Sequence, residues 1–274
     1  MAQQTFPYAW PSYDQTYLFI DGGYVQKRYE EAVRVWFGDN AEIDFPTLIR
    51  NYPAGRSFYY HCLDEEKREG EGESDHQARI AEQKAHLNKV SEAPGCHIRL
   101  GVLKGQEKKR RQKKVDVLLA VDMLTHAANK NMTKALLLAG DLDFQPAIES
   151  LVQLGIFVEL IADDKHTASE LAWAASSYRK LSFSDYYSWS TSALQEKYPL
   201  PRNGGHSRLD LKGAAVLKTG SLDGDAFTLY QSEERFYLCP PGVEGDTPYY
   251  YVHDDLERLK LYLEKIQGHK IIWD

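Results

Sequence analysis

The sequence has few cysteines and no long apolar run. Its 274 residues include three cysteines, Cys62, Cys96 and Cys239, and none of them belongs to a CxxC or Cys/His pattern. This spacing argues against a disulfide framework and against a zinc site. No window approaches the roughly 20 apolar residues that a membrane span needs, and residues 1–16 lack a basic start. We therefore expect a soluble, cytoplasmic protein with no membrane partner.

An excess of positive charge is also missing, because the formal net charge is -7. Such a chain repels a phosphate backbone on average. The exception is residues 104–114 (KGQEKKRRQKK), here called the basic segment, with seven cations against one acid and a local charge of +6 (seven minus one). The cations are Lys104, Lys108, Lys109, Arg110, Arg111, Lys113 and Lys114. Taken alone, such a run fits a solvated loop as well as a nucleic-acid contact.

Apolar periodicity predicts an alternation of strands and helices. We expect strands at 17–20, 57–63, 96–103, 134–140 and 156–162, and a short sixth run at 180–183. A turn at 21–23 is expected to lead into a helix that ends at about residue 37, and further helices are expected within 64–91 and at 115–128, 143–155 and 167–176. Several strands are apolar on both faces, which is typical of a mostly parallel sheet covered by helices on each side. In such α/β domains, sites form beyond the carboxyl ends of the strands.

A different pattern begins after residues 199–205 (PLPRNGG), which we interpret as a linker. Short alternating runs between 209 and 252 predict a small antiparallel sheet. Residues 254–268 have apolar positions at helical spacing, so we expect this helix to pack on that sheet, with 270–273 returning as a strand. The predicted organisation is an N-terminal arm (1–16), an α/β domain (17–195) and a small α+β module (206–274).

Aspartates stand at the predicted strand ends. Asp21 directly follows the first strand, Asp141 directly follows the fourth, and Asp143 lies near the start of the next helix. A single Asp in such a place is more often a helix cap or a turn residue. Because several occur at strand ends of one sheet, we favour a shared acidic site.

The helix predicted around KKVDVLLAVDMLTH (113–126) contributes two further aspartates, Asp116 and Asp122. The sequence around them is apolar on every face, so we expect this helix to be buried, where an unpaired carboxylate is costly. Six residues correspond to about 240° of rotation, so only one aspartate is expected to reach the site. Asp116 is preferred, because in the first turn it would face the favourable end of the helix dipole. Asp122 is either part of the site or a structural acid paired with a backbone amide, Arg or Lys.

This acidic cluster favours a divalent metal. Clustered carboxylates repel one another by about 1–4 kcal/mol per close pair, and a hard cation relieves the repulsion. Oxygen ligands select Mg²⁺ or Mn²⁺. The sequence has no P-loop, no GxGxxG loop and no Ser or Cys nucleophile motif. The economical chemistry is therefore hydrolysis of a phosphodiester by a water that the metal activates.

Three separated blocks carry a family resemblance: FIDGGYV (19–25), QKKVDVLLAVDM (112–123) and LLLAGDLDFQPAIESLVQLGIFVEL (136–160). They resemble the NYN domains of the LabA-like branch, within the PIN-like nuclease superfamily, and TASELAWAASSYRKL (167–181) resembles the closing helix and strand of that family. The resemblance implies a Rossmann-like PIN fold, divalent-metal dependence and single-stranded or structured RNA as the substrate. It also implies that the catalytic and metal-binding residues are Asp21, Asp116, Asp141 and Asp143.

The sequence departs from the family pattern at three positions. Tyr24 stands where many members have Asn, Ala139 where they have Ser, and Ser176 where an Asp is common. These changes remove hydrogen-bonding groups around the site, so they affect the catalytic rate and the metal geometry more than the fold.

The resemblance gives the basic segment a role, because the segment leads directly into the helix with Asp116. We expect it to hold an RNA backbone near the metal, with Tyr24 and Tyr59 as stacking surfaces. Four histidines lack metal-ligand spacing and are interpreted as surface or packing residues: His61, His97, His126 and His166. Asp163 and Asp164 follow the fifth strand, where a solvated turn is favoured over a role in supporting the site.

Two other enzyme classes and one non-enzyme function are alternatives to the predicted ribonuclease. A haloacid-dehalogenase-like site would need an Asp where Gly23 stands, and a Toprim site would normally have Glu in place of Asp21. The non-enzyme alternative is an RNA-binding or regulatory adaptor that keeps the fold with little turnover. In that reading the C-terminal module docks a protein partner.

Overall fold

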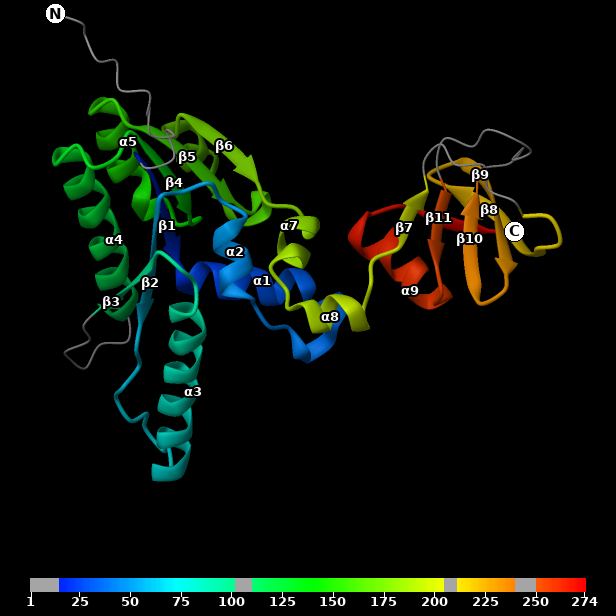
Figure 1. Cartoon of the computed structure of the whole chain (residues 1–274), viewed down its shortest axis with the longest axis horizontal. Helices are drawn as coiled ribbons and strands as arrows, with labels where there is room; N and C mark the ends of the chain where they lie inside the picture. Colours follow the sequence, from blue (N-terminus) through cyan, green and yellow to red (C-terminus); the bar gives the residue numbers. More distant parts are fainter. Residues whose placement is uncertain (1–14, 102–109, 205–210, 240–249) are drawn as a thin grey trace, which may run out of the picture. The chain divides into compact units, whose positions relative to one another are not determined.

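The computed structural model describes residues 15–101, 110–204, 211–239 and 250–274 (Figure 1). The chain divides into two compact units, residues 1–191 and residues 192–274. Within the described ranges, no helix is both long and apolar enough to cross a membrane.

The first unit is built on a six-stranded sheet with strand order β3-β2-β1-β4-β5-β6. All neighbouring strands in it are parallel. The strands are β1 (Thr16–Asp21), β2 (Arg56–Cys62), β3 (Cys96–Gly101), β4 (Lys134–Leu138), β5 (Phe157–Ala162) and β6 (Ser177–Lys180). The predicted α/β fold with a parallel sheet is therefore confirmed.

Helices cover both faces of this sheet (Figure 1). One face is covered by α1 (Gly22–Phe37) and α3 (Glu73–Ser91), the other by α4 (Arg110–Ala128) and α5 (Gln145–Gln153). Shorter helical segments complete the unit: η2 (Gly38–Asn40), α2 (Phe45–Arg50), η3 (Leu142–Phe144), η4 (Asp164–His166), α6 (Ser169–Ala174) and α7 (Phe183–Ser188).

β1 lies at the centre of the sheet because its residues are almost all apolar. All six residues of this strand are buried. Alternate side chains serve opposite faces of the sheet. Phe19 packs with Leu119 of α4 and Ile148 of α5 in one core cluster, and its ring stacks on Phe58 of β2 at 5.4 Å between centroids. Burial on both faces holds the end of β1, and with it Asp21, in a fixed place.

α4 differs from its prediction in two respects. The helix begins at Arg110, so Asp116 lies in its second turn. The prediction that the helix dipole stabilises the Asp116 carboxylate is therefore wrong, because that effect is confined to the first turn. The helix is also not buried on every face. Leu119 is buried, whereas Val117 and Val121 are 60% and 51% exposed. These two valines are four residues apart and form one solvent-facing stripe.

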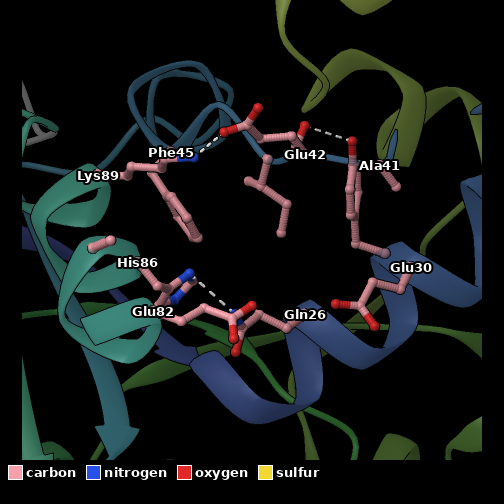
Figure 2. Close-up of a pocket in the computed structure, with 11 residues that line it drawn as sticks. Gln26, Glu30, Ala41, Glu42, Phe45, Glu82, His86 and Lys89 are labelled. Carbon is pink, nitrogen blue, oxygen red and sulfur yellow. Dashed lines mark hydrogen bonds and ion pairs between the residues drawn. The ribbon is translucent and has the colours of Figure 1, made fainter. Parts of the chain in front are cut away.

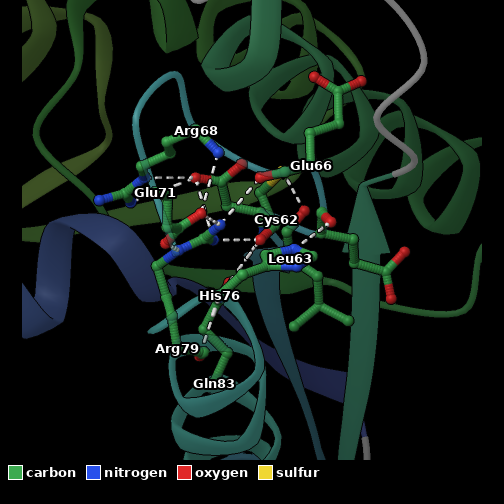
Figure 3. A network of polar contacts seen from close by, with 10 residues as sticks. Cys62, Leu63, Glu66, Arg68, Glu71, His76, Arg79 and Gln83 are labelled. Atoms are coloured by element: carbon green, nitrogen blue, oxygen red, sulfur yellow. Dashed lines mark hydrogen bonds and ion pairs between the residues drawn. The ribbon is translucent and has the colours of Figure 1, made fainter. Parts of the chain in front are cut away.

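Arg79 of α3 orders the connection that leads from β2 to that helix (Figure 3). Its guanidinium donates to the backbone carbonyls of Asp64 and Glu66 and to the carboxylate of Glu71, with 2.7 Å between Nε and Oε1. The hydrogen bond from Arg79 lowers the pKa of Glu71 to about 2. The connection is therefore held by a charge-assisted network.

The second unit contains a six-stranded antiparallel sheet with strand order β12-β8-β9-β10-β11-β7. Its strands are β7 (Arg202–Gly204), β8 (Ala215–Leu222), β9 (Asp225–Ser232), β10 (Arg235–Cys239), β11 (Tyr250–His253) and β12 (Ile271–Trp273). Its helical segments are α8 (Ser192–Lys197), α9 (Leu256–Leu261) and the π-helical turn η5 (Tyr262–Ile266). The predicted small antiparallel sheet and its packed helix are present, since Leu259 and Leu263 are buried against Leu238.

The predicted linker at 199–205 is wrong. Residues 202–204 form β7, which pairs with β11 as an edge strand of the second sheet. The Pro, Asn and Gly residues of this segment disfavour regular secondary structure, which is why the sequence predicts a linker. A short edge strand tolerates such residues because only one of its sides is paired.

Candidate active site

β1 and β4 deliver two aspartates to the same edge of the parallel sheet. The strands are neighbours with Ile20 opposite Leu138, so the residues that follow both strands emerge together. Asp21 and Asp141 line a cavity of about 330 Å³ there. The other residues that line it are Gly23, Tyr24, Lys27, Arg28, Gly140 and His166.

The carboxylate of Asp21 is buried and caps α1. Its Oδ1 accepts from the backbone N–H of Tyr24 at 3.1 Å, and the N–H of Gly23 is a second donor. Burial raises the pKa of Asp21 above its usual value, these two backbone hydrogen bonds oppose the rise, and the charge of Asp141 adds to it. A carboxylate in this state gains from a nearby cation, because a cation offsets both the desolvation and the repulsion.

Asp141 is more exposed than Asp21 and caps the 3₁₀ turn η3. Its Oδ1 accepts from the backbone N–H of Asp143 at 3.0 Å, and the residue lines the cavity. Asp143 itself is exposed and does not line the cavity. The structure therefore brings Asp21 and Asp141 together and leaves Asp143 outside the cavity wall.

Tyr24 is a fixed wall of the cavity. A Cβ built on Gly140 would lie 2.4 Å from the Tyr24 ring, so only glycine fits between β4 and this side chain. The Tyr24 hydroxyl accepts from the backbone N–H of Asp163 at 2.7 Å, and burial raises the pKa of the phenol. Tyr24 thereby ties α1 to the end of β5.

Tyr59 is not a stacking surface. It is fully buried, and its hydroxyl hydrogen-bonds to Nε2 of His86 at 2.8 Å. A Cβ built on Gly22 would lie 2.5 Å from the Tyr59 ring, so the ring packs directly beneath the start of α1. The expectation of base stacking on Tyr59 is wrong, because β2 turns this residue into the core.

Asp116 and Asp122 point in different directions, as their spacing predicts. Asp116 is buried but does not line the cavity. Asp122 forms a bidentate ion pair with Arg99 of β3, at 2.7 and 2.9 Å, and accepts from the Tyr60 hydroxyl at 3.0 Å. Asp122 is therefore the structural acid of the two, held by an arginine on the edge strand.

Sequence reasoning missed three nitrogen-bearing side chains at the cavity, those of Lys27, Arg28 and His166. Arg28 is 6% exposed, and its guanidinium forms an ion pair with the Glu31 carboxylate. Nη2 donates a hydrogen bond to Oε1 at 3.1 Å, whereas Nη1 lies 2.9 Å from Oε2 without hydrogen-bond geometry. Helical spacing from Tyr24 could have flagged Lys27 and Arg28, since they lie three and four residues further along α1 and therefore on the same side of the helix. His166 had no such signal, because it reaches the cavity from η4, the turn that follows β5.

His166 is oriented by Asp163. Its Nδ1 lies 2.9 Å from Asp163 Oδ1, and the same oxygen accepts from the backbone N–H of Lys165. The Tyr186 hydroxyl donates to the other carboxylate oxygen at 3.3 Å. Asp163 is thus part of an ordered network and not of a solvated turn. Asp164 is exposed and pairs with Lys180.

A larger cavity, of about 470 Å³, lies between α1 and α3. Figure 2 shows His86 and Glu82 projecting from α3 toward Gln26 and Glu30 of α1. The imidazole is occupied on both sides, by Gln26 at 3.1 Å and by the Tyr59 hydroxyl, and burial lowers its pKa to about 4. Because His86 is neutral and both of its ring nitrogens are hydrogen-bonded, we interpret it as a packing residue and not as a catalytic one.

Two expectations about the site need qualification. Lys104, Lys108 and Lys109 of the basic segment lie outside the described residues, and α4 begins within the segment at Arg110. Among the residues that are described, no three His, Cys, Asp or Glu side chains are close enough together to hold a metal ion. The four predicted aspartates therefore do not meet as one group, and the roles of Asp116 and Asp143 stay predictions.

A family model of the NYN domain matches residues 15–182. The chain belongs to the NYN domain family. The NYN domain is a member of the PIN-like nuclease superfamily, whose domains typically use divalent metals, and the matched range contains every residue of the strand-end cavity. The LabA-like branch stays a prediction.

Two further comparisons add little to the NYN assignment. No curated protein matches the chain. One solved structure, a protein of unknown function VPA0982 from Vibrio parahaemolyticus, is similar with 13% identity and a TM-score of 0.44, over 63% of this chain and 96% of that one.

Proposed function

We propose that the NYN domain is a divalent-metal-dependent ribonuclease whose reaction centre is the strand-end cavity with Asp21 and Asp141. NYN domains generally act on RNA, which supports the substrate class. The observation that carries the proposal is the pairing of these two carboxylates, one of them buried with a raised pKa, at one edge of the sheet.

Two carboxylates are enough for Mg²⁺ or Mn²⁺ when the substrate supplies the rest. Mg²⁺ keeps several waters and is commonly bound by one or two carboxylates together with phosphate oxygens. When bound, the ion supplies a Lewis acid that stabilises negative charge on the phosphate and lowers the pKa of nearby water. Asp21 and Asp141 would hold it, and Asp116 and Asp143 are predicted to contribute.

We assign Lys27 of the cavity to the phosphate and His166 to proton transfer. Lys27 is exposed, and no described residue pairs with it, so its ammonium is available to a phosphate oxygen. His166 donates from Nδ1 to Asp163, which leaves Nε2 to take a proton from water or to give one to the leaving oxygen. We propose that the basic segment holds the RNA backbone beside α4.

A cleavage assay with matched variants tests this function. Wild type, Asp141→Asn and Asp122→Asn are incubated with labelled single-stranded and hairpin RNAs and DNA controls, in Mn²⁺, in Mg²⁺ and in chelator. Substituting a residue that only supports a metal ligand costs about 10- to 100-fold. We expect Asp141→Asn to lose more than about 100-fold while its circular dichroism spectrum stays unchanged, and Asp122→Asn to cleave normally. Wild-type cleavage by Asp141→Asn would show the site to be misassigned.

The second candidate function is an RNA-binding adaptor with little turnover. It is favoured by the lack of a three-ligand group among the described residues and by Ala139 and Tyr24 at the site. In the same assay, an adaptor would show no cleavage in any metal and RNA binding that survives chelation.

A further inference from the structure

In the described part of the second unit, helical segments cover one face of the sheet. The opposite face, on which Tyr230, Tyr237 and Tyr250 are only half-buried, is here called the open face. α9 and η5 cover the face to which Leu229 and Leu238 point. Side chains alternate along a strand, so the neighbouring residues Tyr230 and Tyr237 point to the open face.

The open face has a row of side chains that runs across four strands. Directly paired residues of antiparallel strands point to the same side. The register places Tyr230 opposite Tyr237, Tyr237 opposite Val252, and Val252 opposite Arg202. Tyr250 and Arg235 lie two positions along their strands from this row, on the same side. We call the set the tyrosine–arginine face: Arg202, Tyr230, Arg235, Tyr237, Tyr250 and Val252.

The face is concave. A cavity of about 370 Å³ lies over β7, β11 and β10, and both Tyr237 and Tyr250 line it. Their ring centroids are 6.2 Å apart with 43° between the ring planes, so the rings are close but not stacked face to face. Both side chains are only half-buried. Each ring therefore keeps surface on which a planar ligand can pack.

The charge of the face is complementary to phosphate. Arg202 and Arg235 are exposed and line the same cavity, where Asp254 is the acidic residue. In the described part of the second unit, no carboxylate forms an ion pair with either guanidinium. Exposed guanidinium groups beside aromatic rings match a strand of alternating phosphates and bases.

This chemistry fits single-stranded RNA better than a duplex. The bases of a duplex are already stacked on one another, so a duplex is bound through its shape and backbone. Unpaired bases stack on aromatic side chains with little dependence on sequence. We propose that the tyrosine–arginine face binds single-stranded RNA, with bases on Tyr237 and Tyr250 and phosphates on Arg202 and Arg235. The inference rests on the proposed ribonuclease function, because it makes the second unit the part that holds the substrate strand.

The test measures binding without cleavage. Full-length Asp141→Asn protein in chelator is titrated into a fluorescein-labelled oligouridylate, and anisotropy is followed at several salt concentrations. In that background, the double variant Tyr237→Leu/Tyr250→Leu is expected to bind at least about fivefold more weakly. Arg235→Gln is expected to reduce the slope of log K against log salt by about 0.7. Lys265→Gln, on η5 of the covered side, is the matched control and should change neither value.

The outcomes of this test distinguish failure of the inference from failure of the nuclease proposal. An unchanged affinity of the folded double variant overturns the inference, and so does equal binding of an abasic strand of the same length. Competition by oligoglutamate as effective as by RNA would make the face a general anion surface and would also overturn it. Cleavage by wild type together with unchanged binding leaves the nuclease proposal standing. If wild type does not cleave RNA but its RNA binding depends on the tyrosine–arginine face, the nuclease proposal fails and the inference about this face stands.

Discussion

The burial of Asp21 sets activity against stability at a single residue. Its pKa is raised in the folded state, mainly by burial. The native protein therefore holds this proton more tightly than the unfolded chain does. Stability from this group is fully present below the unfolded pKa, about 3.9, and is lost as the pH rises through the folded pKa. At neutral pH and without metal, the ionised carboxylate destabilises the fold.

Asp21→Asn is expected to raise the melting temperature of the metal-free protein at pH 7, while it abolishes cleavage. Asparagine keeps an oxygen for the N–H of Tyr24 but carries no charge to desolvate. Each kcal/mol relieved corresponds to a shift of about 2–4 °C for a domain of this size. The measurement is thermal unfolding in chelator at pH 7 and at pH 4. The gain should shrink at pH 4, and a lower melting temperature at pH 7 would contradict the account.

His166 is expected to act on the reaction and not on binding. General acid–base catalysis contributes about 100-fold or more. His166→Ala should therefore slow RNA cleavage by roughly that factor, leave RNA affinity within about twofold, and be partly rescued by added imidazole. Single-turnover rates with and without imidazole measure this. Because the Nδ1 contact with Asp163 is exposed, the melting temperature should change little. A wild-type cleavage rate would remove His166 from the mechanism.

α4 provides a matched pair of carboxylates at the scale of a single element. Asp122 holds Arg99 of β3 and Tyr60 of β2, so its role is to fasten the helix to the sheet. Asp122→Asn is expected to cost about 1–2 kcal/mol in the free energy of unfolding and to leave cleavage unchanged. Asp116→Asn is expected to lower cleavage. Urea unfolding and cleavage rates of both variants measure the contrast, and the reverse pattern would mean that the two roles were exchanged.

The order of strands and long helices in the first unit was predictable from sequence, because each is a local pattern. α1 ends at Phe37 as expected, and five of the predicted strand positions overlap β1 to β5. The six-residue helices α2 and α7 were not predicted, since so short a segment shows little periodicity and depends on tertiary packing. The exposed stripe of Val117 and Val121 was misread, because an apolar residue on the surface has no local signal.

The site was predictable only in part. Asp21 and Asp141 follow strands, and the topology of a parallel sheet brings such residues to one edge. The places of His166 and Asp163 depend on the path that the chain takes after β5, which a local sequence pattern does not show. The burial of Tyr59 depends on which face of β2 points into the core, and the pattern does not show that either. The metal geometry depends on side-chain positions to a fraction of an ångström, which no spacing rule supplies.

Each of the two units has buried hydrophobic side chains of its own. In the first unit, one cluster packs between the parallel sheet and helices α4 and α5, and in the second unit another packs between α9 and the antiparallel sheet. We expect two calorimetric transitions, of which Mn²⁺ shifts only that of the first unit. Binding at about 100 times the dissociation constant stabilises the native state by about 2.7 kcal/mol. The control is Asp141→Asn, whose first transition should not respond. One cooperative transition, or a metal shift of both, would contradict this division.

The strand order β3-β2-β1-β4 has a consequence for the timing of synthesis. Synthesis of the first 101 residues produces β1, β2 and β3, which are neighbours in the sheet. Asp141 follows β4, and β4 is made 118 residues after β1 (134 minus 16). A growing chain therefore has the buried aspartate long before it has the second one. The proposed nuclease cannot cut RNA, its own message included, until the ribosome has added β4 and Asp141 to the chain.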